Sequence, residues 1–149
     1  MEAIKKKPRP AFKEGPISPQ FIADSIAKHT SKTNIGAHQI FLGQVRADVI
    51  DEKVVTGIEY SAYPEMAETE FHNIREAAFE KFDMICMHIY HSLGLVKTGE
   101  ISLFIFVSTK HRQEACEAVQ YLVEQVKEKV PIFGKELLSD DSHQWKVNT

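Results

Sequence analysis

The segment EISLFIFVST, residues 100–109, constrains the fold more than any other part of this chain. It is apolar at almost every position and lacks the alternation of apolar and polar residues that a strand with one solvated face shows. We therefore expect a strand that is covered on both faces and lies centrally in a sheet. The preceding segment MICMHIYHSL, residues 84–93, predicts a neighbouring strand, joined to it by a loop that contains Gly94 and Gly99.

Three helices are predicted around this pair of strands. Ser18 followed by Pro19 supplies an N-cap and a first-turn residue for a short helix. Pro64 opens a long helix with apolar residues at helical spacing, and residues 111–130 carry the strongest amphipathic pattern in the chain. Further strands are predicted at residues 36–46, with a bulge at Gly43, at residues 54–63 after a charged loop, and in two short pieces around IFGKELL and HQWKV.

Strands and helices mix along the chain without a strict βαβ rhythm. This predicts the α+β class, with a mixed, mainly antiparallel sheet. Residues 16–149 are expected to form a single domain. Residues 1–15 are rich in lysine and proline and predict a flexible basic arm, part of which could pair as an edge strand.

Composition excludes several classes of function. The 149 residues suit one domain with a proper core, and the net charge of −3 argues against wholesale binding to nucleic acid or to an anionic membrane. Cys86 and Cys116 form no CxxC pair, which indicates a reducing, cytoplasmic setting. The basic start is followed by no apolar signal-peptide core, and no apolar run approaches the roughly 20 residues that span a bilayer. We expect a soluble intracellular domain.

The helix at residues 111–130 carries the best candidates for chemistry. On a helical wheel, Arg112 projects near the middle of its apolar arc and Lys127 lies just beyond one edge. A guanidinium aimed at the core is costly unless an anion meets it, and partial desolvation favours the neutral form of an amine. His111 and Arg112 also sit in the first turn, where free N–H groups and the helix dipole favour anions.

A plainer interpretation of these residues stays open. Arg112 could reach solvent or pair with a carboxylate, and Lys127 and Lys135 could be ordinary surface lysines. From the residues alone, the pattern indicates a possible anion pocket and no named reaction.

Other reactive side chains are interpreted as structural. His88 and His91 are three apart in a predicted strand, so they point to opposite faces and cannot share a metal. Cys86 and Cys116 are expected to be packed thiols. No zinc ligand set is evident, so we expect no metal site. The carboxylates on the helix after Pro64 are interpreted as its solvated face: Glu65, Glu68 and Glu70.

Several motifs, in order along the chain, resemble a known family. The segments are FLGQVR, YSAYPEM, HSLGLVKTGEISLFIFVSTKHR, VKEKVPIFGKE and, near the end, Trp145. Together they resemble the large, catalytic subunit of molybdopterin synthase, the MoaE family, over residues 34–147.

The resemblance implies a fold, partners and a reaction. The fold is of α/β-hammerhead type with a small additional β subdomain. The family forms a homodimer flanked by two copies of a small ubiquitin-like sulfur-carrier subunit, a heterotetramer. The thiocarboxylate at that subunit's Gly-Gly end enters a pocket of the large subunit. The reaction adds two sulfurs to cyclic pyranopterin monophosphate (precursor Z), a pterin phosphate, and gives molybdopterin. It implies no metal and no cofactor.

The resemblance also assigns roles to residues. Lys127 matches the central catalytic lysine beside the thiocarboxylate. His111 and Arg112 match a basic pair that binds the substrate's phosphate or pterin side, in this family from the other subunit of the dimer. The remaining matches are the strand-end motif Gln44, Val45 and Arg46, which meets substrate, and the turn Pro131, Ile132 and Phe133, followed by Gly134, Lys135 and Glu136.

One position departs from the family pattern. The family usually has a second lysine where this chain has Gly134, as in PIWKKE. We hypothesise that Gly134 relaxes the turn so that Lys135 reaches the pocket and acts as the second catalytic lysine. The rival hypothesis is that Lys127 works with Arg46 and Arg112 alone.

Other functions remain possible at this stage. A different transferase that acts on a phosphorylated small molecule would use the same cations. A degenerate large subunit could be a non-catalytic scaffold that binds a ubiquitin-like partner, with Gly134 as the sign of lost activity. A nucleic-acid-binding module fits least, because of the net charge and the lack of an RNA-reading aromatic motif.

Overall fold

The computed structural model describes residues 10–147. Residues 1–9 of the predicted arm lie outside the described residues. The helices are α1 (Pro19–Ala27), α2 (Pro64–Lys81) and α3 (Arg112–Lys129). The strands are β1 (Phe12–Glu14), β2 (Ala37–Gln44), β3 (Val49–Ile50), β4 (Lys53–Ala62), β5 (Cys86–Lys97), β6 (Ile101–Thr109), β7 (Ile132–Leu138) and β8 (His143–Trp145). None of the helices in this part of the chain has both the length and the apolar character needed to cross a bilayer.

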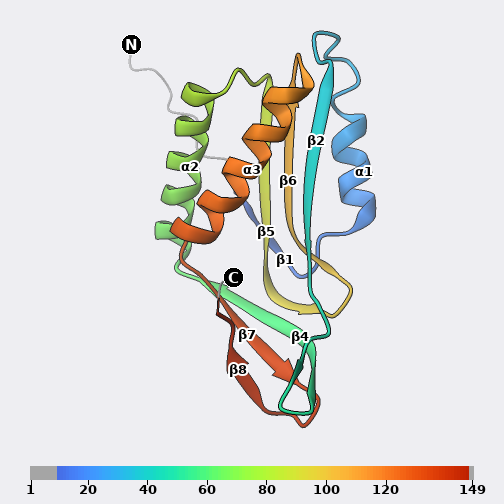
Figure 1. Cartoon of the computed structure of the whole chain (residues 1–149), viewed down its shortest axis with the longest axis vertical. Coiled ribbons are helices and arrows are strands. Elements are labelled where there is room, and N and C mark those ends of the chain that lie inside the picture. Colours follow the sequence, from blue (N-terminus) through green and yellow to red (C-terminus); the bar gives the residue numbers. More distant parts are fainter. Residues whose placement is uncertain (1–9, 148–149) are drawn as a thin grey trace.

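The strands form one mixed sheet in the order β2-β6-β5-β4-β7-β8. Neighbours along this path are antiparallel, whereas β1 pairs with β5 in parallel. Figure 1 shows α2 and α3 over one face of the upper strands and α1 on the other side, with β4, β7 and β8 extending below the helices. The predicted α+β class with a mainly antiparallel sheet is confirmed.

Strand β6 is the centre of the core, as the apolar run predicts. All of its residues from Ser102 to Thr109 are buried. Alternate side chains serve different layers, because successive residues of a strand face opposite ways. Leu103, Ile105 and Val107 pack with α2 and α3. Phe104 and Phe106 pack with Ile17 and Ile22 beside α1.

The helix ends follow the predicted signals. Ser18 Oγ accepts a hydrogen bond from the Phe21 amide at 3.1 Å, and Pro19 is the first residue of α1. Helix α2 begins at Pro64. Helix α3 turns one face to the sheet, and its buried residues are Ala115, Ala118, Val119, Leu122 and Val126.

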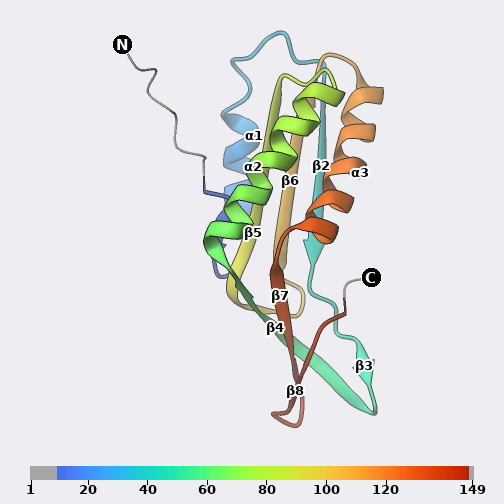
Figure 2. The ribbon, with the colours of Figure 1, turned by 90° about the vertical axis from the view of Figure 1, so that its left-hand side faces the viewer.

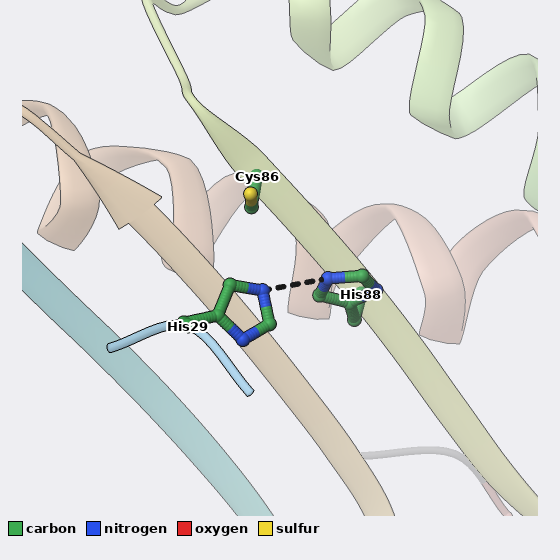
Figure 3. Close-up of side chains that lie close together, drawn as sticks. All are labelled: His29, Cys86 and His88. Carbon is green, nitrogen blue, oxygen red and sulfur yellow. Dashed lines mark hydrogen bonds between the residues drawn. The ribbon is translucent and has the colours of Figure 1, made fainter. Parts of the chain in front are cut away.

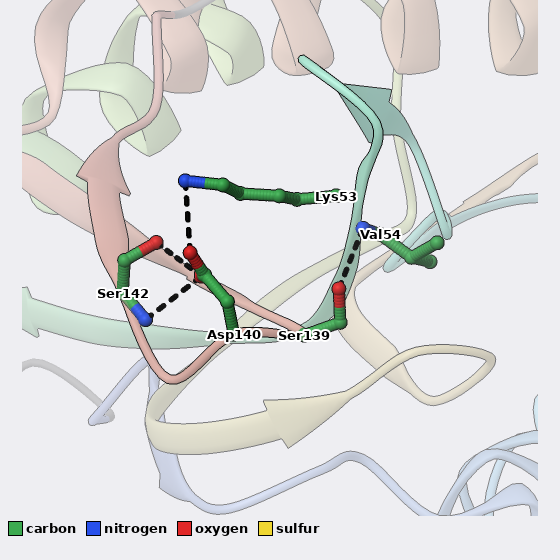
Figure 4. Close-up of polar contacts among 5 residues, drawn as sticks. All are labelled: Lys53, Val54, Ser139, Asp140 and Ser142. Carbon is green, nitrogen blue, oxygen red and sulfur yellow. Dashed lines mark hydrogen bonds and ion pairs between the residues drawn. The ribbon is translucent and has the colours of Figure 1, made fainter.

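The lower part of the molecule is a small sheet built from β4, β7 and β8, with β3 paired to β4 (Figure 2). Polar contacts fix the turn between β7 and β8 (Figure 4). Lys53 Nζ lies 2.8 Å from Asp140 Oδ2, and Ser142 donates to the same carboxylate from its amide and its hydroxyl. The Lys53 side chain and these Ser142 contacts lower the pKa of Asp140 far below its usual range. The Val54 amide donates to Ser139 Oγ at 3.1 Å.

Some expectations about secondary structure were wrong in detail. Strand β5 does not stop before Gly94 but continues to Lys97, because Gly94 adopts a φ of +81° within the strand. The charged loop contains the two-residue strand β3. Part of the predicted arm, Phe12–Glu14, is strand β1. The predicted irregularity at Gly43 is confirmed by a register shift between Gly43 and Gln44.

Two side chains of α3 and one of α2 also differ from expectation. Cys116 is exposed, with Sγ 3.6 Å from Gln39 Oε1, so it is not a packed thiol. Arg112 is exposed instead of aimed at the core, which agrees with the plainer interpretation. The observed core side of α3 is rotated from the predicted arc towards Ala118, so Arg112, near the middle of that arc, and Cys116, at its edge, both fall outside the core. On α2, Met66, one of the apolar residues at helical spacing that predict this helix, is 62% exposed and lies outside the core.

The two-sided core makes a prediction about stability. Leu122 is fully buried between α3 and the sheet, so Leu122→Ala should lower the free energy of unfolding by about 2–5 kcal/mol. The matched control is Leu42→Ala, because Leu42 is 43% exposed, and it should change the free energy by less than about 1 kcal/mol. Urea unfolding followed by circular dichroism measures both. Equal losses in the two variants would contradict this picture of the core.

Candidate active site

A cavity of about 560 Å³ opens where the small sheet meets the C-terminal end of α3. Six strands, the last turn of α3 and the residues that follow it contribute to its wall. The lining residues are Phe41, Gly43 and Gln44, then Tyr60, His91, Ser102 and Leu103, then residues 126–134, and finally Trp145 and Lys146. Three lysines stand among them, at 127, 129 and 146, so the cavity is a local concentration of positive charge on an acidic chain.

Lys127 stands in the last turn of α3, at the mouth of this cavity. Partial burial, followed by the positive charges of Lys146 and Arg46, lowers the pKa of Lys127 below the usual value for lysine. The wheel argument predicted an amine at the edge of the apolar arc, and Lys127 occupies that position. A lowered pKa suits an amine that exchanges protons with a bound substrate.

The inner wall carries a small polar group of three side chains. Tyr60 donates a hydrogen bond from its hydroxyl to Ser102 Oγ at 3.1 Å, and its burial raises the pKa of the phenol. The ring of His91 lies edge-on to Tyr60, with centroids 5.0 Å apart. His91 Nδ1 donates to the Ser92 carbonyl oxygen at 2.8 Å. Sequence reasoning missed these residues, because only strand pairing brings Tyr60, His91 and Ser102 together.

Lys146 is the other residue that sequence reasoning missed. Its amide donates to the Gly134 carbonyl oxygen at 2.8 Å, which places it beside β7 just after β8 ends. A Cβ at position 134 would lie 3.6 Å from Lys146 Cβ and 3.0 Å from Ile58 Cγ2. The space that a side chain at position 134 would need is therefore already narrow, and Lys146 borders it.

Lys135 does not reach the cavity by the route that we hypothesised. Gly134 pairs with Tyr60 and Lys135 pairs with Glu59 in an unbroken antiparallel register, and Gly134 has no positive φ. Neighbouring residues of a strand face opposite ways, so Lys135 does not share the face of Gly134, and Lys135 does not line the cavity. Glu136 is buried on the cavity side of β7, and Gln144 Nε2 donates to its Oε1 at 3.4 Å.

The three residues of the strand-end motif, Gln44, Val45 and Arg46, lie in different surroundings. Gln44 lines the cavity. Val45 packs with Ile58 and Val96, and its backbone groups bond to Glu100 and Gly99, so its side chain belongs to the core. Arg46 is exposed and pairs with Asp48 at 3.3 Å, close enough to Lys127 to affect its pKa.

The basic pair at the start of α3 lies far from this cavity. His111 and Arg112 are exposed, and α3 rises roughly 1.5 Å per residue, so Arg112 and Lys127 stand about 22 Å apart along the helix. Within one chain the structure brings Lys127, Gln44 and Gly134 together and leaves His111 and Arg112 outside.

Comparison with known proteins bears on what this cavity is for. The sequence model of the family described as MoaE protein matches residues 13–129, which is most of the chain. The chain belongs to the MoaE protein family. The resemblance inferred from the motifs is thereby confirmed.

Individual relatives support the MoaE assignment. The chain is 36% identical, over 121 residues, to the molybdopterin synthase catalytic subunit of Emericella nidulans, and the match covers 81% of this chain and 62% of that protein. The crystal structure of molybdopterin synthase from Staphylococcus aureus superposes with a TM-score of 0.80 at 30% identity, covering 92% of this chain and 96% of the other. The complex of subunits 1 and 2 of molybdopterin-converting factor from Helicobacter pylori 26695 gives 0.75 at 23% identity, covering 91% and 89%, and shares the fold.

The match to the fungal MoaE proteins is partial in length. The chain spans a little over three fifths of the two Emericella and Aspergillus fumigatus relatives, 62% and 64%. The similarity therefore covers only part of each fungal protein, and in this chain the matched part includes residues that line the cavity.

The buried histidine of this site predicts a pH dependence of stability. Burial is the main cause that lowers the pKa of His91, from 6.5 to about 4. Between these values the unfolded chain binds a proton that the folded chain does not, so stability falls as the pH falls through this window. From pH 7.5 to pH 5, wild type should lose about 2 kcal/mol more than His91→Gln.

Urea unfolding at the two pH values measures this difference. His143→Gln is the control, because His143 is exposed, and it should behave as wild type. Parallel losses in wild type and His91→Gln would refute the assignment of His91 as a buried neutral imidazole.

Proposed function

We propose that this chain is the catalytic subunit of a molybdopterin synthase and acts as a sulfurtransferase in molybdenum cofactor biosynthesis. It converts cyclic pyranopterin monophosphate to molybdopterin with two sulfurs from the thiocarboxylated C-terminus of a small ubiquitin-like partner. The observation that carries the proposal is the pKa-shifted Lys127 at the mouth of a lysine-lined cavity, in a chain of the MoaE family. The similar protein of Emericella nidulans is a molybdopterin synthase catalytic subunit, and the similar Staphylococcus aureus structure is that of molybdopterin synthase.

The charge of the cavity suits two anionic reactants. The pterin carries a cyclic phosphate, and the partner's tail ends in a thiocarboxylate. Two unit negative charges about 4 Å apart repel by roughly 4 kcal/mol at an effective dielectric constant of about 20. Lys127, Lys129 and Lys146 offset that repulsion, and cations fixed in place also stabilise the oxyanion that develops as sulfur adds.

Lys127 is the central catalytic residue of this mechanism. It binds the incoming anion while charged. Because its pKa is lowered, it also gives up and takes back a proton more readily than an ordinary lysine, as the cyclic phosphate opens. Gln44 and Tyr60, from β2 and β4, supply neutral hydrogen-bonding groups on the same wall.

Lys146 takes the part of the second lysine that the family usually has at position 134. Two observations support this role. Lys146 borders the space above Gly134, and after partial burial its positive charge is the next cause that lowers the pKa of Lys127. The hypothesis that Lys135 takes this part lacks such support, because Lys135 does not line the cavity.

The partner's tail and a second copy of the chain complete the site. Phe133 and Trp145 are 44% and 60% exposed at the cavity and offer the aromatic surface that protein interfaces favour. The Helicobacter structure is a complex of two subunits of molybdopterin-converting factor. In a homodimer within a heterotetramer, His111 and Arg112 of one copy serve the substrate of the other, which agrees with their distance from Lys127 in the same chain.

Two further points belong to this proposal. The reaction runs in the cytoplasm and needs no cofactor from this subunit, and neither nucleic acid nor membrane is a partner. A non-catalytic scaffold is the alternative, because Gly134 stands where the family usually has lysine. Reconstituted conversion of precursor Z with the thiocarboxylated partner, followed as dithiolene formation, separates the two. Partner binding without any dithiolene would favour the scaffold.

The first functional prediction concerns Lys127. Lys127→Ala should lower turnover by at least about 100-fold, because it removes both a fixed charge and a proton-transfer group. Partner binding, measured by calorimetry, should weaken far less. Turnover within a few-fold of wild type would remove Lys127 from the mechanism.

The second prediction compares two lysines of the C-terminal strands. Lys146→Ala should lower turnover about tenfold or more, equivalent to about 1.4 kcal/mol of barrier, and raise the pKa of Lys127 in an NMR titration. Lys135→Ala is the matched control and should keep turnover within about twofold of wild type, because Lys135 does not line the cavity. The reverse result, with Lys135→Ala inactive and Lys146→Ala normal, would restore the original hypothesis.

A further inference from the structure

Three potential metal ligands meet beside α1, away from the lysine-lined cavity. The ligand atoms of His29, Cys86 and His88 all lie within 4.8 Å of one another. Cys86 and His88 are two residues apart in β5, so they share the face that α1 covers, and His29 comes from the turn that follows α1. Figure 3 shows the two imidazoles edge to edge across the gap between these elements, with the sulfur beside them. We propose that these side chains bind a divalent transition-metal cation of the zinc type.

The hydrogen bonding of His29 already suits a metal ligand. Its Nδ1 lies 2.7 Å from the Ser25 carbonyl oxygen, which can only accept, so Nδ1 carries the proton and Nε2 keeps its lone pair. A backbone carbonyl that holds the outer nitrogen in this way is the usual support of a metal-bound histidine. His29 is 8% exposed and packs against Phe106, with ring centroids 4.8 Å apart, so its direction is fixed.

The distance between the two histidines also fits. His29 Nε2 and His88 Nε2 are 3.1 Å apart and share one hydrogen. Two nitrogens that bind one tetrahedral zinc ion at 2.0–2.1 Å lie about 3.4 Å apart. A shift of a few tenths of an ångström and loss of the shared proton would convert this hydrogen bond into a pair of metal ligands.

Cys86 supplies the softer ligand and a reason for selectivity. It is buried, and Lys32 Nζ lies 2.8 Å from its sulfur. A thiolate is the form that binds metals. A divalent cation bound to the sulfur would replace Lys32 Nζ as its neighbour. One thiolate with two imidazoles favours zinc or its neighbours over magnesium or calcium, which prefer oxygen ligands.

Space for a fourth ligand is present. A cavity of about 420 Å³ runs along the edge of β5 that β1 and β4 leave uncovered, since these strands pair only with residues 91–93 and 94–97. Cys86, His88 and Lys32 form part of its wall. A water molecule can therefore complete a tetrahedral site. The bound ion would tie the turn after α1 to β5, and this role is independent of the sulfur chemistry proposed for the other cavity.

No spacing in the sequence predicts this site. The histidine nearest to His88 in the sequence is His91, which lies on the opposite face of β5. The histidine that His88 contacts in the structure, His29, is 59 residues away in the sequence. Neither CxxC nor HxxxH spacing occurs among the three ligands.

Cobalt titration of the full chain, stripped with a chelator, tests the proposal. One equivalent of Co²⁺ should give the intense visible bands of a tetrahedral site and a thiolate-to-cobalt charge-transfer band, and Zn²⁺ should displace it. The decisive variant is Cys116→Ser, which leaves Cys86 as the remaining thiol of the chain. It should retain both sets of bands and a rise in melting temperature on adding Zn²⁺.

Ligand variants sharpen the test. Cys86→Ser should lose the charge-transfer band. His29→Gln should weaken Co²⁺ binding by more than about 100-fold, which exceeds the loss expected if His29 only formed a hydrogen bond to a metal ligand. His72→Gln is the matched control, because His72 lines the same cavity outside the triad, and binding should stay unchanged. Lack of a charge-transfer band in Cys116→Ser would overturn the proposal, whether or not the ligand variants fold.

Discussion

The burial of β6 on both faces is the constraint on which the rest of the structure depends. A strand with side chains of Leu103, Ile105 and Val107 on one side and Phe104 and Phe106 on the other needs a cover on each face. Helices α2 and α3 supply one cover and α1 the other. Because β6 is central, β2 and β5 flank it, and these two strands carry some of the residues of the sites described above, among them Gln44, His88 and His91. The burial of apolar side chains thus determines which elements surround β6, and the functional side chains lie on these elements.

The lysine-lined cavity forms where two differently directed parts of one sheet meet. Strand β5 pairs with β6 through residues 86–91 and then, past the positive φ of Gly94, pairs with β4 through residues 94–97. That change of partner swings β4, β7 and β8 away from the helices (Figure 2). The end of α3 faces the corner so formed. Residues from both parts of the sheet therefore line one cavity beside the end of α3.

Much of the fold could be predicted from local pattern, because each signal acts within a few residues. The apolar run of β6, the Ser18 cap, the prolines that open α1 and α2, and the bulge at Gly43 are signals of this kind. The same holds for Lys127, whose place depends only on the face of one helix. Lys146, Tyr60 and His91 could not be assigned, because their proximity depends on the register between strands. The helical wheel placed Cys116 and Arg112 on the buried side of α3, and both are exposed. A wheel gives the periodicity of a helix but not which part of its apolar face the sheet covers.

Gly134 and Lys146 have a consequence for grafting segments between relatives. A lysine placed alone at position 134 would meet Ile58 within 3.0 Å of its Cβ and bring its charge beside an amine already held by the neighbouring strand. The single change that makes the turn look more like other members of the family would therefore crowd the cavity instead of improving it. Strands β7 and β8 form one structural unit, and a chimera that keeps their native pairing should keep this part of the cavity wall intact, whereas one that separates them should not.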